Sequence, residues 1–177
     1  MFNITSLDEY FLSLGVDINK KLLDGKTALH IAALYNNKET AELLISHGIN
    51  INEKDEDRET ALHKAAINNS KETAELLISH GINIIEKNYR KETALHYAAH
   101  YNSKETAELL ITHGAKIDEK DNDEETALHF AVKYNREEIA ELLLSHGAYI
   151  NTKDKDGKTA LHYATSNNNK EIAENII

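Results

Sequence analysis

The chain is 177 residues long and carries 30 acidic and 20 basic side chains, which gives a formal net charge of −10. This acidity argues against general binding to nucleic acid or to anionic membrane surfaces, both of which attract Lys and Arg. The sequence has no cysteine, which excludes disulfides and thiolate chemistry. No run approaches the roughly 20 apolar residues that a membrane-spanning helix needs.

The tetrapeptide Thr-Ala-Leu-His recurs with a fixed spacing of 33 residues. It occurs five times, at Thr27–His30, Thr60–His63, Thr93–His96, Thr126–His129 and Thr159–His162. A constant period of this size indicates one small supersecondary unit copied in tandem. Each copy can bury its apolar face only against its neighbours, so the period predicts a repeat array and shifts attention from catalysis to surface recognition.

We expect one domain over residues 1–177, because no Pro-, Gly- or Ser-rich linker interrupts the repeats. The period divides it into an N-terminal half repeat, four full repeats and a truncated C-terminal repeat. Their expected ranges are 1–21, then 22–54, 55–87, 88–120 and 121–153, and finally 154–177.

Within each unit the residue pattern predicts two short helices. In the first full unit, Thr27 is the expected N-cap of a helix over residues 28–35, because its hydroxyl can accept a free backbone N–H. Asn36, which recurs in all five units, suits a left-handed position at the end of this helix. A second helix follows over residues 38–45, and Gly48 ends it.

Two weaker signals complete the predicted unit. Glu39 lies three residues after Asn36, a spacing that fits a capping box at the start of the second helix. After Gly48, Ile49–Asn52 alternates apolar and polar residues, which predicts a short extended arm of a hairpin. The expected unit is therefore two helices followed by a hairpin loop.

These features resemble the ankyrin repeat, whose pattern is Asp-x-x-Gly-x-Thr-Pro-Leu-His-x-Ala-Ala, followed by a second helix that ends in Leu-Leu-x-x-Gly. Asp154–Ala164 reads Asp-Lys-Asp-Gly-Lys-Thr-Ala-Leu-His-Tyr-Ala, and Gly25–Ala33 reads Gly-Lys-Thr-Ala-Leu-His-Ile-Ala-Ala. The resemblance spans essentially the whole chain. It implies an all-α ankyrin-repeat solenoid of helix–turn–helix units joined by β-hairpin loops, with the hairpins and first helices on a concave face.

The sequence departs from the family pattern in the turns and in the second helices. The turn glycine survives as Gly25 and Gly157 but is replaced by Arg58, Lys91 and Glu124, which would strain a left-handed turn. Threonine stands in the second helix of the first three units at a position where the last two have Ile139 and Ile172. These threonines are Thr40, Thr73 and Thr106. We therefore predict that the early and central repeats are less stable than the fourth.

Ten histidines raise the possibility of a metal site, but nine of them belong to two repeated series. Five end the tetrapeptide motif, where the resemblance implies a structural hydrogen bond to the Thr of the same unit and to a neighbouring backbone. Four precede the glycine that ends the second helix, and only His100 lies outside both series. Packed repeats are on the order of 10 Å apart, too far for two motif histidines to share a zinc ion. We expect no metal site and no cofactor.

Catalytic and calcium-binding patterns are weak or missing. The run Asp121-x-Asp123-x-Glu125 resembles the start of a calcium loop, but it lacks the glycine at the sixth position and the glutamate at the twelfth. No phosphate-binding loop, nucleophile elbow or zinc-protease helix is present in the sequence. We therefore predict that the protein is not an enzyme.

The predicted binding residues follow from the resemblance. Ankyrin repeats contact partners mainly through hairpin tips and the last residues of the first helix, and the third unit places Tyr, Arg and His at these positions. Tyr and Arg are enriched at binding hot spots. The predicted partner-binding residues are Tyr89, Arg90, His100, Tyr101, Tyr134, Lys133, Asp123 and Tyr35. The alternative is that these tyrosines only cover the gaps between repeats, with their hydroxyls in water.

The residue after the motif histidine is assigned to packing. This position holds Tyr97, Phe130 and Tyr163 in the last three units, and Lys64 in the second. A Lys stem can cover apolar surface while its amine reaches water. We expect Lys64 to behave in this way and to loosen the interface between its repeat and the next.

Resemblance and surface chemistry together favour a non-catalytic scaffold that binds a neutral or basic protein on its concave face, in the cytoplasm. We expect a monomer. The alternative is a structural segment of a longer ankyrin array that self-associates through its end faces. This alternative rests on Ile172, Ile176 and Ile177, which lie on the last helix with no polar cap after them.

Overall fold

The computed structural model describes residues 17–168 and 170–176 of the chain. Within these residues the secondary structure consists of short α-helices joined by turns and loops, with no β-strand. The helices come in pairs. The pairs are α2 (Ala28–Leu34) with α3 (Lys38–Ser46), α4 (Ala61–Ile67) with α5 (Lys71–Ser79), α6 (Ala94–Tyr101) with α7 (Lys104–Thr112), α8 (Ala127–Lys133) with α9 (Glu137–Ser145), and α10 (Ala160–Ser166) with α11 (Lys170–Ile176).

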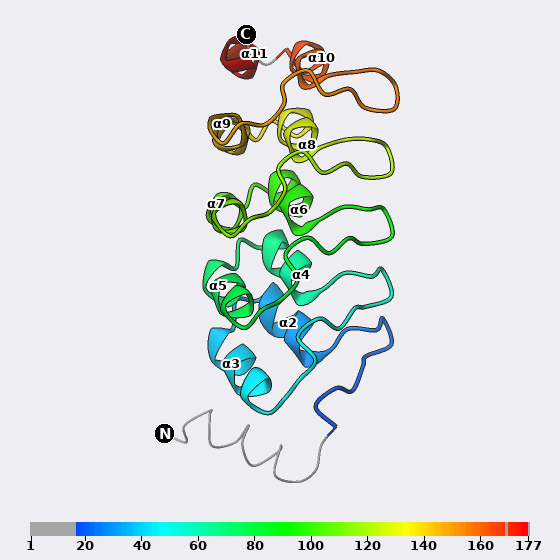
Figure 1. The fold of residues 1–177 in the computed structure, drawn as a ribbon, viewed down its shortest axis with the longest axis vertical. Helices are drawn as coiled ribbons and strands as arrows, with labels where there is room; N and C mark the ends of the chain where they lie inside the picture. Colours follow the sequence, from blue (N-terminus) through cyan, green and yellow to red (C-terminus); the bar gives the residue numbers. More distant parts are fainter. Residues whose placement is uncertain (1–16, 169, 177) are drawn as a thin grey trace.

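The pairs stack in chain order into an elongated array (Figure 1). The first helices α2, α4, α6, α8 and α10 form one column, and each contacts the first helix of the next pair. The second helices form a parallel column, and the loops project from the opposite side (Figure 1). We call the side made by the loops and the first helices the loop face. This all-helical stack confirms the predicted solenoid.

Each first helix begins where the sequence predicts, although α2 ends at Leu34, one residue before the predicted end at residue 35. Thr27 is the N-cap of α2, with an extended backbone at φ −93° and ψ 170°, and the equivalent threonines cap the other first helices. Asn36 has φ 52°, and the asparagines in register with it are also left-handed. Asn tolerates this region better than most residues, so it ends a helix of about two turns.

The capping box predicted at Asn36 and Glu39 is wrong. The N-cap of α3 is Asn37, one residue later, and its side chain accepts the amide of Thr40. Asn36 instead reaches the next repeat, where its Oδ1 accepts the amide of Thr73 at 3.1 Å. Its side chain therefore caps a neighbouring helix and ties two repeats together.

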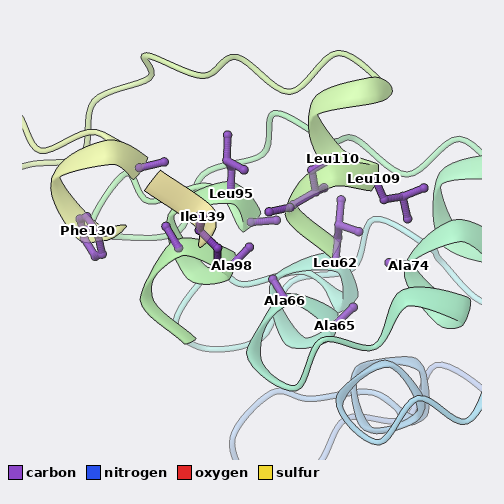
Figure 2. Packing of buried hydrophobic residues seen from close by; sticks show 14 of the residues in the cluster. Leu62, Ala65, Ala66, Ala74, Leu95, Ala98, Leu109, Leu110, Phe130 and Ile139 are labelled. Atoms are coloured by element: carbon purple, nitrogen blue, oxygen red, sulfur yellow. The ribbon is translucent and has the colours of Figure 1, made fainter. Parts of the chain in front are cut away.

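The core is a continuous stripe between the two columns of helices (Figure 2). Leu62 and Leu95 are each 1% exposed, and Ala65, Ala66 and Ala98 are fully buried beside them. Alanine lets neighbouring helices approach closely, while the leucines provide the buried apolar area that stabilises the stack. The core thus passes from repeat to repeat without a break.

The loops are tight turns and contain no strand within the described residues. In the second unit the amide of Asp55 donates to the carbonyl of Glu59 at 3.0 Å and closes the turn. Successive loop tips are tied together, because the amide of Tyr89 donates to the carbonyl of Asp57 at 3.1 Å. The hairpin shape is therefore present. Ile49–Asn52, the predicted extended arm, forms no strand, and Ile51 and Asn52 lie in a turn.

Two predicted features lie outside the described residues. The first 16 residues of the predicted half repeat are not described, and neither are the side chains of Ile176 and Ile177. The third residue of the C-terminal prediction, Ile172, is described and is only 1% exposed. It therefore belongs to the core and not to an open end face.

Candidate protein-binding face

The motif histidines connect each first helix to the loop of the next repeat. In the second unit, Nδ1 of His63 accepts the amide of Thr60 at 3.1 Å, so the ring proton lies on Nε2. Nε2 then donates to the carbonyl of Glu92, 3.2 Å away in the following loop. The same bonds recur at His30, His96 and His129. The predicted structural role of these histidines is confirmed.

Burial keeps these rings neutral. It lowers the pKa of both His63 and His96 to about 4, although the hydrogen bonds to the Glu92 and Glu125 carbonyls oppose the shift. A neutral imidazole with its proton on Nε2 is the form that the observed bonds require. Among the residues that the structure describes, no three His, Cys, Asp or Glu side chains are grouped to hold a metal ion.

Three of the predicted binding residues form one stack of rings. His100 lies between Tyr134, with ring centroids 4.1 Å apart, and Tyr101, at 4.6 Å, and both pairs are nearly parallel. Burial lowers the pKa of His100, opposed by the charge of Glu92, which favours the neutral form of the ring in the middle of the stack. Tyr101 and Tyr134 remain 46% and 37% exposed, and so present ring area to a partner.

Three charged residues of the predicted set surround this stack. Arg90, Lys133 and Asp123 line the same hollow as His100 and Tyr134, which lies between the third and fourth loops and has a volume of about 300 Å³. Lys133 pairs with Glu125 at 2.9 Å. Burial alone would lower the pKa of Lys133, but the bond to Glu125 outweighs this effect and raises it.

The other two predicted residues lie apart from the stack. Tyr89 is on the neighbouring loop tip, where it lines an adjacent hollow together with Arg90 and faces the guanidinium of Arg58 at 5.6 Å. Tyr35 follows α2, two repeats before α6, and is 71% exposed. Five of the eight predicted residues thus line one hollow, and Tyr101 stacks on His100 at the edge of the ring stack. Tyr89 lies beside this hollow and Tyr35 is separate.

Lys64 differs from its prediction. Its amine does not reach water: Lys64 is 5% exposed, and Nζ pairs with Asp55 at 2.7 Å and with Glu59. Burial alone would lower the pKa of Lys64, but these bonds outweigh it and raise the pKa. The hydroxyl of Tyr97 also donates to Glu59, from the next repeat. Lys64 therefore belongs to a buried polar network within its own repeat, and Tyr97 connects that network to the next repeat. The sequence pattern did not indicate this network.

Each of the three central loops carries a buried glutamate on the loop face. Glu59, Glu92 and Glu125 are between 6% and 8% exposed, although they lie on loops. The sequence pattern did not indicate that these three glutamates are buried. Their recurrence exactly one period apart was the available signal.

Comparison with protein families agrees with this architecture. Models of the ankyrin repeat match residues 3–88, 84–154 and 156–177. The chain is an ankyrin-repeat protein. No curated protein sequence matches it closely enough to count as a relative. In the part of this ankyrin-repeat chain that the structure describes, no helix has the length and apolarity needed to cross a membrane.

Proposed function

We propose that this protein is a non-catalytic scaffold that binds a partner protein on its loop face, centred on the ring stack of Tyr101, His100 and Tyr134. Ankyrin repeats generally serve as protein–protein interaction modules and are typically non-catalytic. The full proposed contact set is Tyr89, Arg90, His100, Tyr101, Tyr134, Lys133, Asp123 and Tyr35.

The observation that carries this proposal is the exposed ring area at the centre of a charged surface. Tyr89, Tyr101 and Tyr134 are 64%, 46% and 37% exposed. Tyr101 ends α6, Tyr134 follows α8 and Tyr89 lies on a loop tip. Rigid aromatic rings lose little conformational entropy on binding, which suits them to be contact anchors. The rings would bind the partner, and the surrounding acidic side chains would favour a neutral or basic one.

The test is capture of a partner from cell lysate by three forms of the chain. Wild type is compared with Tyr89→Ala/Arg90→Ala/Tyr101→Ala and with Glu42→Ala/Glu75→Ala/Glu108→Ala, which changes exposed residues on α3, α5 and α7, on the far side of the stack. Circular dichroism confirms that all three fold. We expect a protein that wild type and the far-side variant hold and the loop-face variant loses. Equal capture by all three forms would reject the loop face as the site.

A second candidate function is self-association through the C-terminal end of the stack. A hollow of about 410 Å³ on α10 is lined by Leu161, His162 and Thr165. His162 is exposed, whereas the equivalent His63 and His96 are 1% exposed beneath the next repeat. The surface that other repeats cover is therefore open here, and a second copy of the chain could cover it.

Light scattering over a range of concentrations tests this second candidate. Self-association predicts a mass that rises with concentration in wild type and stays at 19.9 kDa in Leu161→Lys. Leu23→Lys, at an exposed position near the other end of the stack, is the matched control and should behave as wild type. A wild-type chain that remains monomeric at high concentration would reject the candidate.

A further inference from the structure

The three buried loop glutamates have different surroundings, and the repeat provides an internal comparison. Glu59 pairs with the amine of Lys64 and accepts the hydroxyl of Tyr97. Glu125 pairs with the amine of Lys133 at 2.9 Å and lies 3.0 Å from the hydroxyl of Tyr163. Each of these two carboxylates therefore has one cation and one phenol as partners, which offsets the cost of its burial.

The phenols bridge two loops. The hydroxyl of Tyr97 reaches Glu59 in the loop before it and lies 3.1 Å from Asn88 in its own loop. The hydroxyl of Tyr163 lies in the same way between Glu125 and Asp154, 2.6 Å from the latter. A donor thus occupies the space between the buried side chains of two successive loops.

Glu92 has neither kind of partner. Its Oε2 accepts a hydrogen bond from the side-chain Nδ2 of Asn88 at 2.8 Å, and within residues 17–168 and 170–176 no cation lies within ion-pair distance of Glu92. In the other two loops the cation and the phenol come from positions 5, 8 or 38 residues after the glutamate, and after Glu92 these positions hold Tyr97, His100 and Phe130. The hydroxyl of Tyr97 bonds to Glu59, burial favours the neutral form of His100, and the side chain of Phe130 has no polar atom. Glu92 is nevertheless 92% buried, since its exposed fraction is 8%.

Phe130 leaves a second carboxylate without its usual partner. Asp55 and Asp154 occupy the position of Asp121 in other units. The Oδ2 of Asp55 pairs with the amine of Lys64 at 2.7 Å, and the Oδ2 of Asp154 accepts the hydroxyl of Tyr163 at 2.6 Å. Asp121 is also 8% exposed, and its Oδ1 accepts two loop amides. In the described part of the chain no hydrogen-bond donor is found for its Oδ2. Burial raises the pKa of Asp121.

The ring of Phe130 is placed as the tyrosine rings are. It meets His96 edge to face at 5.4 Å, and Tyr97 meets His63 in the same geometry at 5.5 Å. A hydroxyl on the Phe130 ring would therefore lie in the space between the third and fourth loops. That space belongs to the hollow of about 300 Å³, which Glu92, Asp121 and His100 also line.

We propose that this hollow receives one basic side chain, Lys or Arg, of the partner protein, which pairs with Glu92 and Asp121 and contacts the rings of His100, Phe130 and Tyr134. The inference rests on the proposed function, because it names the chemistry of the residue that the partner brings to the same face. Two carboxylates more than nine-tenths buried, each with an oxygen that no described donor reaches, attract a cation strongly. Aromatic faces add cation–π attraction at short range.

The two cationic side chains that line the hollow, Lys133 and Arg90, pair with neither Glu92 nor Asp121 in the described structure. Lys133 pairs with Glu125 through both carboxylate oxygens, at 2.9 and 3.1 Å. Arg90 lines the hollow but is exposed, and its guanidinium forms no ion pair with Glu92 or Asp121 in the described structure. The hollow therefore has a net negative lining, and in the described structure neither Glu92 nor Asp121 pairs with a cation of the chain itself.

The test uses small probes with one cation and a neutral backbone. Acetyl-lysine-N-methylamide and acetyl-arginine-N-methylamide are titrated into isotope-labelled protein at pH 7.5, with the uncharged norleucine analogue as the matched control. We expect saturable shifts of the Glu92 and Asp121 side-chain carboxyl carbons and of the His100 ring with at least one cationic probe. The norleucine analogue should leave them unchanged.

The decisive variant is Phe130→Tyr, which restores the hydroxyl that the neighbouring repeats have. It is expected to raise the melting temperature and to weaken probe binding by about tenfold or more, because the phenol takes the donor position between the loops. Glu92→Gln keeps the shape of the hollow, removes its charge and should weaken binding similarly. Glu56→Gln, on an exposed loop tip, is the control for loss of one surface charge.

The outcomes separate this inference from the proposed function. Probe binding that Phe130→Tyr and Glu92→Gln leave unchanged would overturn the inference, as would equal shifts with ammonium chloride or with the norleucine analogue. If the loop-face variant loses a captured partner while Phe130→Tyr still holds it fully, the proposed function stands and the basic-residue pocket is rejected. If the probes bind as expected but no partner depends on the loop face, the pocket stands and the proposed function fails.

Discussion

Thr106 carries a buried hydroxyl with no hydrogen-bond partner in the described structure. It is 0% exposed and occupies the position of Ile139 in the fourth unit. We predict that Thr106→Val raises the free energy of unfolding by about 1–2 kcal/mol, because it removes an unsatisfied polar group from the core. Urea unfolding followed by circular dichroism measures the change.

Thr73 is the matched control, since it is also fully buried but donates its hydroxyl to Asn36 at 3.1 Å. Thr73→Val loses this bond and should give no gain. Equal stabilisation by the two changes would show that the Thr106 hydroxyl carries no special cost.

Lys91 stands at a left-handed turn position with φ 61°, where Gly25 and Gly157 occupy the equivalent sites. Lys91→Gly should raise the free energy of unfolding by about 1 kcal/mol, because glycine has no Cβ strain in this region. Lys91→Ala removes the side-chain atoms beyond Cβ but keeps the Cβ, so the stability of this variant should stay near that of wild type. Thermal unfolding of the two variants decides the matter, and a gain in both would point to the lysine charge instead of the backbone.

The sequence predicted a backbone feature correctly where it depends on the identity of one residue. The left-handed asparagines and the strained Arg58, Lys91 and Glu124 depend only on their own backbone. The partners of Glu92 could not be predicted in this way, because they would come from residues 5, 8 and 38 positions later in the sequence. The absence of a donor at Phe130 becomes informative only when the repeats are compared in three dimensions.

At the scale of the elements, the motif histidines determine how the repeats respond to pH. The pKa of His63 and of His96 is about 4 in the folded chain and 6.5 when the group is exposed. The unfolded chain therefore binds more protons between these values, so stability falls as the pH decreases through this window. Once the histidines of the unfolded chain are fully protonated, the free energy of unfolding is lower by about 3 kcal/mol per histidine at most.

We predict that the midpoint of urea unfolding is constant above about pH 7 and falls steadily between pH 6.5 and 5, above the usual range of carboxylates. In parallel, the ring signals of His63 and His96 should show neutral imidazole with the proton on Nε2 down to about pH 5. Stability that stays flat over this window, or a ring that titrates near pH 6.5, would contradict the buried neutral state.

The elements were predicted with small errors at their edges. Thr27 and Asn36 bound the first helix as expected, and the second helix starts at Lys38 as predicted. Its N-cap, however, is Asn37, because the side chain of Asn36 caps a helix of the neighbouring repeat. The alternation in Ile49–Asn52 suggested an extended arm, but Ile51 and Asn52 lie in a turn, and the amide of Asn50 donates to Asn19 of the preceding unit. Both errors arise from contacts between repeats, which the local pattern does not contain.

At the scale of the whole molecule, the repeats differ in how well their second helices pack. Ile139 fills the core in α9, whereas Thr73 and Thr106 take its place in α5 and α7. We predict that amides of α5 and α7 exchange with solvent faster than those of α9 in moderate urea, because an array whose units differ in stability opens unevenly. Uniform exchange rates across the three helices would show that coupling between repeats dominates over these differences.

The stack itself followed from the 33-residue period, since a unit of this size can bury its apolar face only against another copy. The composition of the loop face followed in part: the rings of His100, Tyr101 and Tyr134 do converge. The period already places Tyr35 two repeats before Tyr101 and so apart from the stack. The sequence could not show that Lys64 is buried with two carboxylates. That placement depends on which repeat faces which.

The central claim is that a partner protein binds the loop face around His100. Hydrogen exchange of the chain alone and with its captured partner tests it most directly, because it maps the contact without a variant. The account predicts slower exchange in the loops over residues 88–93 and 121–126 and at the end of α6, with α3, α5 and α7 unchanged. Protection confined to the second helices, or to the open surface of α10, would contradict it.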